Sequence, residues 1–357
     1  MVVTVHHERG EHVEGMMLLR RRRKAECLEN TVFELVLNHF GYKFTNYFVI
    51  SKIIRTFVAS YANQRQTDKY HPGFGCCRTL GDMRRKCMEV KSEKVYIRIG
   101  RNSLSFTAFD VTNTACPLRF EPYVVKGGIS MPANLREAFK RTDLIISDSH
   151  IQQAQVLVDT PSMLVPVEQF EEPLIETLFF HSFPAKDEEK RIVLYNVLPT
   201  LNAVCLFAVN KDLHKVINDR FERVQFIQAM TPVWHHLHQR SFTGHRNKLY
   251  GCFHEKQLDI FSFQQNRFKF ANSFEAAHFS DALYFLLYVW KQLRLDAHHD
   301  EIHLVGDIPE QDALLQELKR YVQKAYLINP AADFQESPAT EVAGMPYDLM
   351  TLLTKGR

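Results

Sequence analysis

The feature that most constrains this chain is an order of strands and helices that occurs twice. Residues 247–357 predict three consecutive strands, a strongly apolar helix, a strand ending in Gly306-Asp307, a second helix and a final strand. Residues 88–246 begin with a hairpin and continue with helix and strand segments in a similar order. Two such halves predict a pseudo-duplicated α/β protein of two lobes, each with a mixed β-sheet flanked by helices.

The first hairpin is the clearest of these predictions. Apolar residues occupy every second position from Val95 to Ile99, and a second alternation, with Leu104, Phe106 and Ala108 on one face, covers residues 104–109. The intervening Gly100-Arg101-Asn102-Ser103 segment predicts a hairpin turn. Further helices are expected at residues 132–140, 167–180, 211–221, 232–239, 275–293 and from 309, and further strands at 155–158, 163–166, 191–195, 203–208, 224–228, 248–253, 258–263, 267–272, 302–305 and 326–329.

Composition excludes several classes of protein. The 357 residues are 45% hydrophobic and 24% charged, which is typical of a globular protein. No apolar run approaches the roughly 18 residues of a membrane-spanning helix, and no signal-peptide pattern is visible. We therefore expect a cytoplasmic protein with no membrane partner.

Residues 1–87 differ from the remainder in charge. They hold 15 Lys+Arg against 8 Asp+Glu, a net charge of +7, with a basic run at residues 20–24. We predict a poorly ordered basic N-terminal extension. Two alternatives stay open: the basic run binds nucleic acid, which is not favoured, or the natural chain starts at Met83 or Met88 and the extension is a mis-assigned start.

Five sequence runs resemble one bacterial family. This family is known as domain-of-unknown-function family 3822, and its members are described as having an actin-like ATPase fold with no assigned activity. The resemblance covers about residues 93–353 and implies an actin-like ATPase fold, whose core is similar to ribonuclease H. The runs that carry it are residues 193–199, 282–293, 303–309, 328–334 and 344–350.

The resemblance also implies where a nucleotide would bind. Related actin-like families wrap phosphate with an Asp-x-Gly turn in the first hairpin and a second such turn in the other half, and place glycines after a later strand. The matching positions here are Arg98 to Ser103, Cys252 to Lys256 with Asp259, and Gly306-Asp307. The candidate residues of a degenerate nucleotide cleft are therefore Gly100, Arg101, Asn102, Ser103, His254, Asp259, Gly306 and Asp307.

The chemistry at these positions does not favour an enzyme. Arg98 stands where a carboxylate would hold hydrated Mg²⁺, and a cation cannot coordinate a metal ion. Bulky side chains at His254, Glu255 and Lys256 replace the glycines that would let backbone amides approach phosphate. Asp259 and Asp307 also have ordinary readings, as a solvent-facing residue and as the cap of the helix that follows. We assign no catalytic residue and expect no cofactor, with ATP and Mg²⁺ not favoured.

Two groups of histidines suggest a metal site, but neither has the partners that zinc requires. They are His235, His236 and His238, and His298, His299 and His303. We predict no metal. The leading hypothesis is a non-catalytic scaffold that binds another, unidentified protein. The alternative is a nucleotide-binding sensor or ATPase that uses the cleft between the lobes, and homo-oligomerisation is left open.

Overall fold

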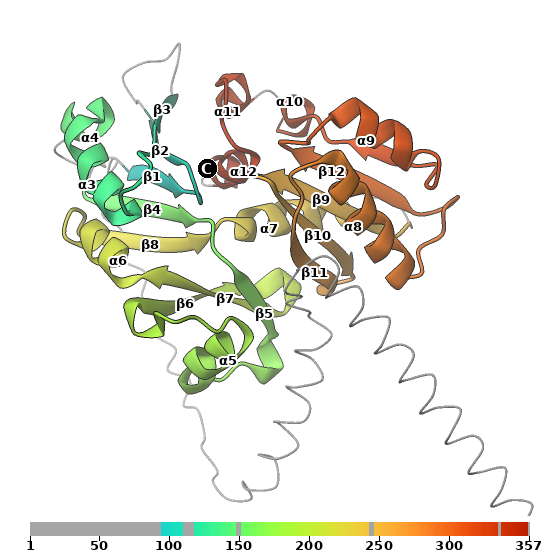
Figure 1. The fold of residues 1–357 in the computed structure, drawn as a ribbon, viewed down its shortest axis with the longest axis horizontal. Helices are drawn as coiled ribbons and strands as arrows, with labels where there is room; N and C mark the ends of the chain where they lie inside the picture. Colours follow the sequence, from blue (N-terminus) through green and yellow to red (C-terminus); the bar gives the residue numbers. More distant parts are fainter. Residues whose placement is uncertain (1–93, 110–117, 148–150, 243–245, 335–336, 356–357) are drawn as a thin grey trace, which may run out of the picture. The chain divides into compact units, whose positions relative to one another are not determined.

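Two five-stranded sheets with the same topology form the framework of the protein (Figure 1). The structure, a computed structural model, describes residues 94–109, 118–147, 151–242, 246–334 and 337–355. The predicted N-terminal extension, its basic run and Met88 lie outside these residues. Strand order is β3-β2-β1-β4-β8 in the first sheet and β11-β10-β9-β12-β13 in the second.

In each sheet the first three strands form an antiparallel meander, and the last two run parallel to the central strand. The first sheet comprises β1 (Lys94–Ile99), β2 (Leu104–Phe109), β3 (Leu118–Tyr123), β4 (Gln153–Val158) and β8 (Arg223–Gln228). The second comprises β9 (Lys248–His254), β10 (Gln257–Gln264), β11 (Arg267–Glu275), β12 (Glu301–Gly306) and β13 (Ala325–Leu327). The predicted fold of two mixed sheets with helices is confirmed.

Helices cover both faces of the first sheet. On one face, α3 (Met131–Arg141), α4 (Asp143–Ser147) and α6 (Lys211–Asn218) pack against Val95, Ile97 and Ile99 of β1. The other face of β1 carries Tyr96, which joins a different apolar cluster together with α7 (Met230–Ser241). Because successive side chains of a strand point to opposite faces, Arg98 must lie on the same face as Tyr96.

The described residues of the second half form five helices. The helix α8 (Phe279–Gln292) follows the meander, and α9 (Gln311–Leu318) lies between β12 and β13. After β13 come two short helices, α10 (Pro330–Asp333) and α11 (Pro338–Glu341), and then α12 (Tyr347–Lys355). In the first half β8 is followed by α7, and in the second half β13 is followed, after α10 and α11, by α12. Both α7 and α12 belong to one shared apolar cluster.

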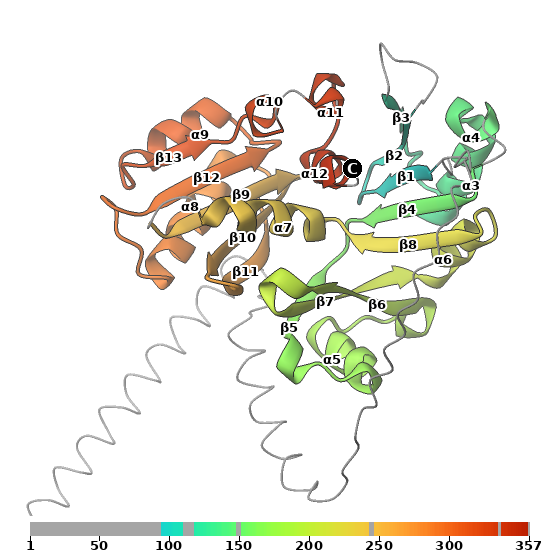
Figure 2. The same ribbon diagram turned by 180° about the vertical axis from the view of Figure 1, so that it is seen from behind.

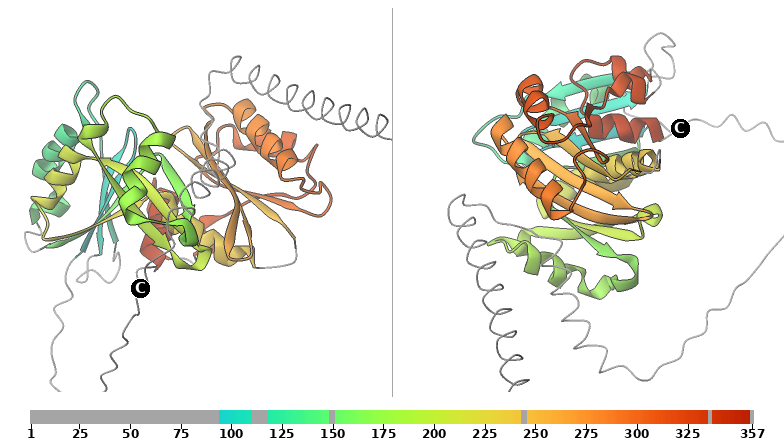
Figure 3. Two further views of the ribbon diagram at one scale, coloured as in Figure 1. Left: turned by 90° about the horizontal axis from the view of Figure 1, so that it is seen from below. Right: turned by 90° about the vertical axis from the view of Figure 1, so that its right-hand side faces the viewer.

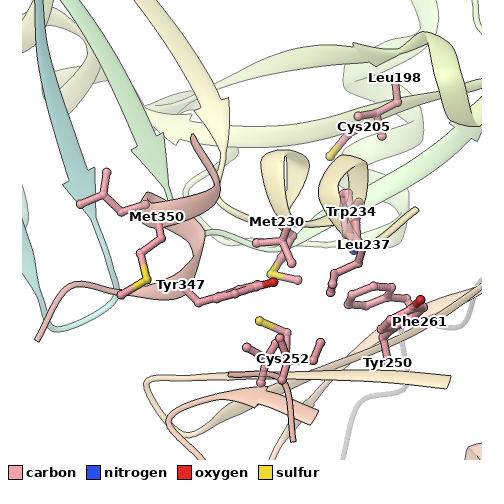
Figure 4. Close-up of a cluster of buried hydrophobic side chains, with 14 of the residues drawn as sticks. Leu198, Cys205, Met230, Trp234, Leu237, Tyr250, Cys252, Phe261, Tyr347 and Met350 are labelled. Carbon is pink, nitrogen blue, oxygen red and sulfur yellow. The ribbon is translucent and has the colours of Figure 1, made fainter. Parts of the chain in front are cut away.

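This shared cluster contains residues from both halves (Figure 4). It combines Met230, Trp234 and Leu237 of α7 with Tyr347 and Met350 of α12, and the two helices pack against each other. In Figures 2 and 3, α12 also lies between the two five-stranded sheets. Side chains of the second sheet complete it, among them Tyr250, Cys252 and Phe261.

A smaller sheet is formed by residues that lie between β4 and β8 in the sequence. Its order is β5-β7-β6, and α5 (Ile175–Ser182) packs on one face. The side chain of Asn196 on β6 pairs with the free edge of β8, donating to the carbonyl of Phe226 at 3.0 Å and accepting from the amide of Gln228 at 2.8 Å. The strands are β5 (Ser162–Pro166), β6 (Arg191–Leu198) and β7 (Ala203–Asn210).

Two helix predictions need correction. The helix expected over residues 167–180 is instead two short 3₁₀ turns followed by α5, because Pro173 has no amide hydrogen to continue a longer helix. The helix expected over 275–293 begins only at Phe279, since β11 continues to Glu275. Strand β3 and helices α4, α10, α11 and α12 were not predicted.

Candidate functional site

The first candidate site is built around Arg98, whose guanidinium is brought inward by its position in β1. The residue is only 3% exposed. Its Nε donates to both carboxylate oxygens of Asp348 on α12, at 3.0 and 2.9 Å. Its Nη1 donates to Ser103 Oγ at 2.8 Å and to Glu255 Oε1 at 3.0 Å. We call Arg98, Asp348, Glu255, Ser103 and Asn102 the Arg98 cluster.

The Arg98 cluster keeps its charges through mutual pairing. Burial alone would lower the pKa of Arg98, but the charges of Asp348 and Glu255 more than offset this and raise it. Burial likewise acts to raise the pKa of Glu255, but hydrogen bonds from Ser103, Asn102 and Arg98 lower it. A guanidinium thus sits in the interior with two carboxylates beside it.

Glu255 joins the hairpin turns of the two halves directly. It lies in the turn between β9 and β10, and its carboxylate reaches the turn between β1 and β2. Oε2 accepts from the backbone amide of Asn102 at 2.8 Å, and Oε1 accepts from the Ser103 hydroxyl. Gly100 makes room for this contact, since a Cβ there would collide with the Glu255 carboxylate.

A second group of polar side chains, of which Asp259 is buried, surrounds His254 at the end of β9. Its Nδ1 lies 3.2 Å from Asp159 Oδ2, and its Nε2 is hydrogen-bonded to Asp259. Asp259 in turn accepts from the hydroxyl of Ser273, its cross-strand neighbour on β11. We call His254, Asp159, Asp259 and Ser273 the His254 cluster.

The two carboxylates keep His254 charged. Burial alone would lower its pKa, but the hydrogen bonds and charges of Asp159 and Asp259 raise it to about 10. The pKa of Asp159 is lowered, because the bond and charge of His254 outweigh the effect of burial. His254 is therefore an imidazolium at neutral pH, held between two acids rather than available as a proton acceptor.

The structure brings most of the candidate residues together, at the two hairpin turns and the adjoining strand ends. Gly100, Asn102 and Ser103 contact the opposite turn through Glu255. Gly306 has φ of +96°, and a Cβ there would collide with the carbonyl of Phe253, the neighbour of His254. The backbone amide of Asp307 donates to that same carbonyl at 3.0 Å. Glycine is thus needed at 306 for close packing of two strands.

Other candidates occupy positions that the sequence did not predict. Asp259, for which a solvent-facing position was the alternative to a place in the cleft, is 6% exposed within the His254 cluster. Asp307 was expected to cap the following helix, but Glu310 occupies the N-cap position of α9 and makes no side-chain capping bond. The side chains of Arg101 and Asp307 are exposed. They contribute no hydrogen bond to either cluster among the described residues.

Three members of the clusters were missed by sequence reasoning: Asp159, Asp348 and Ser273. The signal for Asp348 was present, because a cation that β1 turns toward the interior requires an acidic partner. The local pattern could not say which acid that would be, since Arg98 and Asp348 are 250 residues apart in sequence.

The histidines suspected of binding metal have separate partners. On α7, His236 contacts Asp333, His238 contacts the carbonyl of Gln265, and His235 contacts Thr200. The other group is similarly dispersed, with His299 beside Asp296 and His303 beside Glu301. Within the described part of the chain, no group of three or more His, Cys, Asp or Glu side chains is placed to hold a metal ion.

Comparison with protein families gives the affiliation of the chain. Residues 85–325 match the family described as Protein of unknown function (DUF3822). The chain belongs to this family. The resemblance inferred from the sequence is confirmed, and the family description assigns no activity to its members. No curated protein matches the sequence.

Solved structures support the same fold. One is a protein of unknown function with an actin-like ATPase fold from Bacteroides thetaiotaomicron VPI-5482, which is 29% identical. The alignment covers 69% of this chain and 95% of that one, with a TM-score of 0.60. The chain therefore has the actin-like ATPase fold.

Two weaker similarities involve secretion and pilus proteins. The first, the PilM–PilN type IV pilus biogenesis complex, is 11% identical and covers 73% of this chain and 97% of that chain, with a TM-score of 0.44. The cytoplasmic domain of EpsL, an inner-membrane component of the Vibrio cholerae type II secretion system, is 10% identical and covers 67% and 86%, with a TM-score of 0.34. In the described part of this chain, none of the helices combines the length and apolarity needed to cross a membrane.

Proposed function

We propose that this protein is a cytoplasmic, non-catalytic member of the actin-like ATPase fold that works by binding another protein. The observation that carries the proposal is the internal charge pairing at the two hairpin turns. The resemblance to actin-like families associates these two turns with phosphate binding in those families. Here the Arg98 and His254 clusters together hold two cations and four carboxylates.

This balance opposes nucleotide binding in two ways. The clusters carry a net charge of −2, counted as two cations against four carboxylates, so they offer the phosphates of a nucleotide no excess of positive charge. The one guanidinium among them is already bonded to Asp348 and Glu255. A phosphate that took these bonds would leave buried carboxylates without a cation, which costs several kcal/mol, roughly 3 to 5.

Exposed aromatic side chains on the second half are consistent with a protein partner. Tyr321 and Tyr326 are 58% and 44% exposed, and Tyr284 is 42% exposed. Tyrosine is enriched at protein interfaces, where it supplies a large contact area and a polar hydroxyl. The partner itself stays unidentified, and self-association is one form that this binding can take.

The direct test is ATP turnover by the purified full-length protein, measured with and without Mg²⁺. The proposal predicts no turnover above that of buffer. Mg²⁺-dependent hydrolysis that disappears in both Asp259→Ala and Asp307→Ala would overturn it, because it would show that these carboxylates serve a reaction. A nucleotide sensor without hydrolysis is the alternative, and it predicts thermal stabilisation by millimolar ATP or ADP.

A further inference from the structure

The turn that carries Glu255 has an unfavourable backbone conformation. Glu255 and Lys256, its two central residues, have φ of +44° and +65°. Such two-residue hairpin turns normally use Asn-Gly or Asp-Gly. A left-handed conformation costs roughly 1 to 2 kcal/mol for each residue with a Cβ. Backbone strain of this kind persists only where the surrounding contacts enforce it.

The contacts of the Glu255 carboxylate meet this requirement. Three donors from the first half converge on it: the Asn102 amide, the Ser103 hydroxyl and the Arg98 guanidinium. Gly100 has no side chain, which leaves space for the carboxylate oxygens of Glu255. The carboxylate is also within reach of solvent, since the Glu255 side chain is 17% exposed.

We infer that these three donors form a receptor for a small oxyanion, and that Glu255 is its resident ligand. The receptor belongs to the first half, whereas the ligand comes from the second. An external carboxylate or a tetrahedral oxyanion that displaced Glu255 would keep the donors satisfied and would release the strained turn. This receptor is separate from the proposed function. In the wild-type protein the Glu255 carboxylate fills it, and no nucleotide is involved.

Chemical rescue of Glu255→Ala in the full-length protein tests this inference. The variant removes the ligand and leaves the three donors in place. Thermal unfolding is followed in sodium acetate and in sodium phosphate, each compared with sodium chloride at equal ionic strength. We expect a saturable rise in melting temperature, about 3 to 5 °C at ten times the dissociation constant. Rescue by acetate alone identifies a planar carboxylate receptor, and rescue by phosphate identifies a tetrahedral one.

Matched variants make the result specific. Glu310→Ala is the control, because Glu310 is an exposed glutamate with φ of +44°. It should show no rescue, as should wild type and the double variant Ser103→Ala/Glu255→Ala, which lacks one donor. If Glu255→Ala does not fold, Glu255→Gln retains the shape without the charge, and phosphate should stabilise it more than wild type.

Equal effects of every anion on the Glu255 variants, the control and wild type would overturn the inference. ATP binding by wild type would overturn the proposed function, but it would leave the rescue comparison unaffected.

Discussion

Replacing Asp348 with asparagine should destabilise the protein strongly, although asparagine has nearly the same shape. Asp348 is 5% exposed and accepts two bonds from Arg98, which is 3% exposed. Removing one partner of a buried ion pair leaves an uncompensated charge and costs about 3 to 5 kcal/mol. Because Glu255 still pairs with Arg98, we expect the lower end of this range, about 3 kcal/mol.

This loss translates into a measurable shift. For a domain of this size, 1 kcal/mol changes the melting temperature by about 2 to 4 °C, so Asp348→Asn should lower it by about 6 to 12 °C. Thermal unfolding followed by circular dichroism gives the shift, and urea unfolding gives the free energy. Asp307→Asn is the control, since an exposed substitution changes stability by at most about 0.5 kcal/mol.

The double variant Arg98→Met/Asp348→Leu separates the charge from the packing. Apolar replacement of a whole buried pair is often neutral or stabilising. The double variant should therefore be more stable than Asp348→Asn. If Asp348→Asn unfolds at the same temperature as Asp307→Asn, the buried pair does not hold the two halves together and the reasoning is refuted.

Two further predictions concern single residues. The His254 imidazolium stabilises the fold fully below the pKa of an unfolded histidine, near 6.5, and this contribution disappears as pH rises toward about 10. The difference in free energy of unfolding between wild type and His254→Asn, measured in urea, should therefore shrink between pH 6 and pH 10. A difference that does not depend on pH would show that His254 carries no charge. Gly306→Ala should lower the free energy of unfolding more than Gly344→Ala, because both glycines have positive φ but only at 306 would a Cβ strike a carbonyl. Chemical denaturation should give a loss of about 3 kcal/mol for the first and about 1 kcal/mol for the second. Equal losses would contradict the close strand contact at Phe253.

Much of the fold could be predicted because its signals are local. Alternation from Val95 to Ile99 identifies β1, and the same alternation places Arg98 with Tyr96 on the face opposite the apolar residues. The region of residues 167–180 misled the prediction, because its apolar and acidic residues suit a helix while Pro173 interrupts one. Helix α12 was missed for another reason: its burial depends on α7 and on both sheets, which no local pattern reports.

The candidate site was harder to predict than the fold. The two hairpin turns were located correctly, whereas the incompatibility of Arg98 with bound Mg²⁺ stays a prediction. What could not be inferred was that Glu255 reaches across to the opposite turn, or that Asp159 and Asp348 provide the counter-charges. These are contacts between residues far apart in sequence, set by how the two halves pack.

The central claim is that the two hairpin turns are held by internal ion pairs and do not bind a nucleotide. Calorimetric titration of the wild-type, full-length protein with ATP and Mg²⁺ tests it most directly. The account predicts no saturable heat of binding up to millimolar nucleotide. A saturable one-site isotherm that is lost in Ser103→Ala, while this variant still unfolds cooperatively, would contradict it.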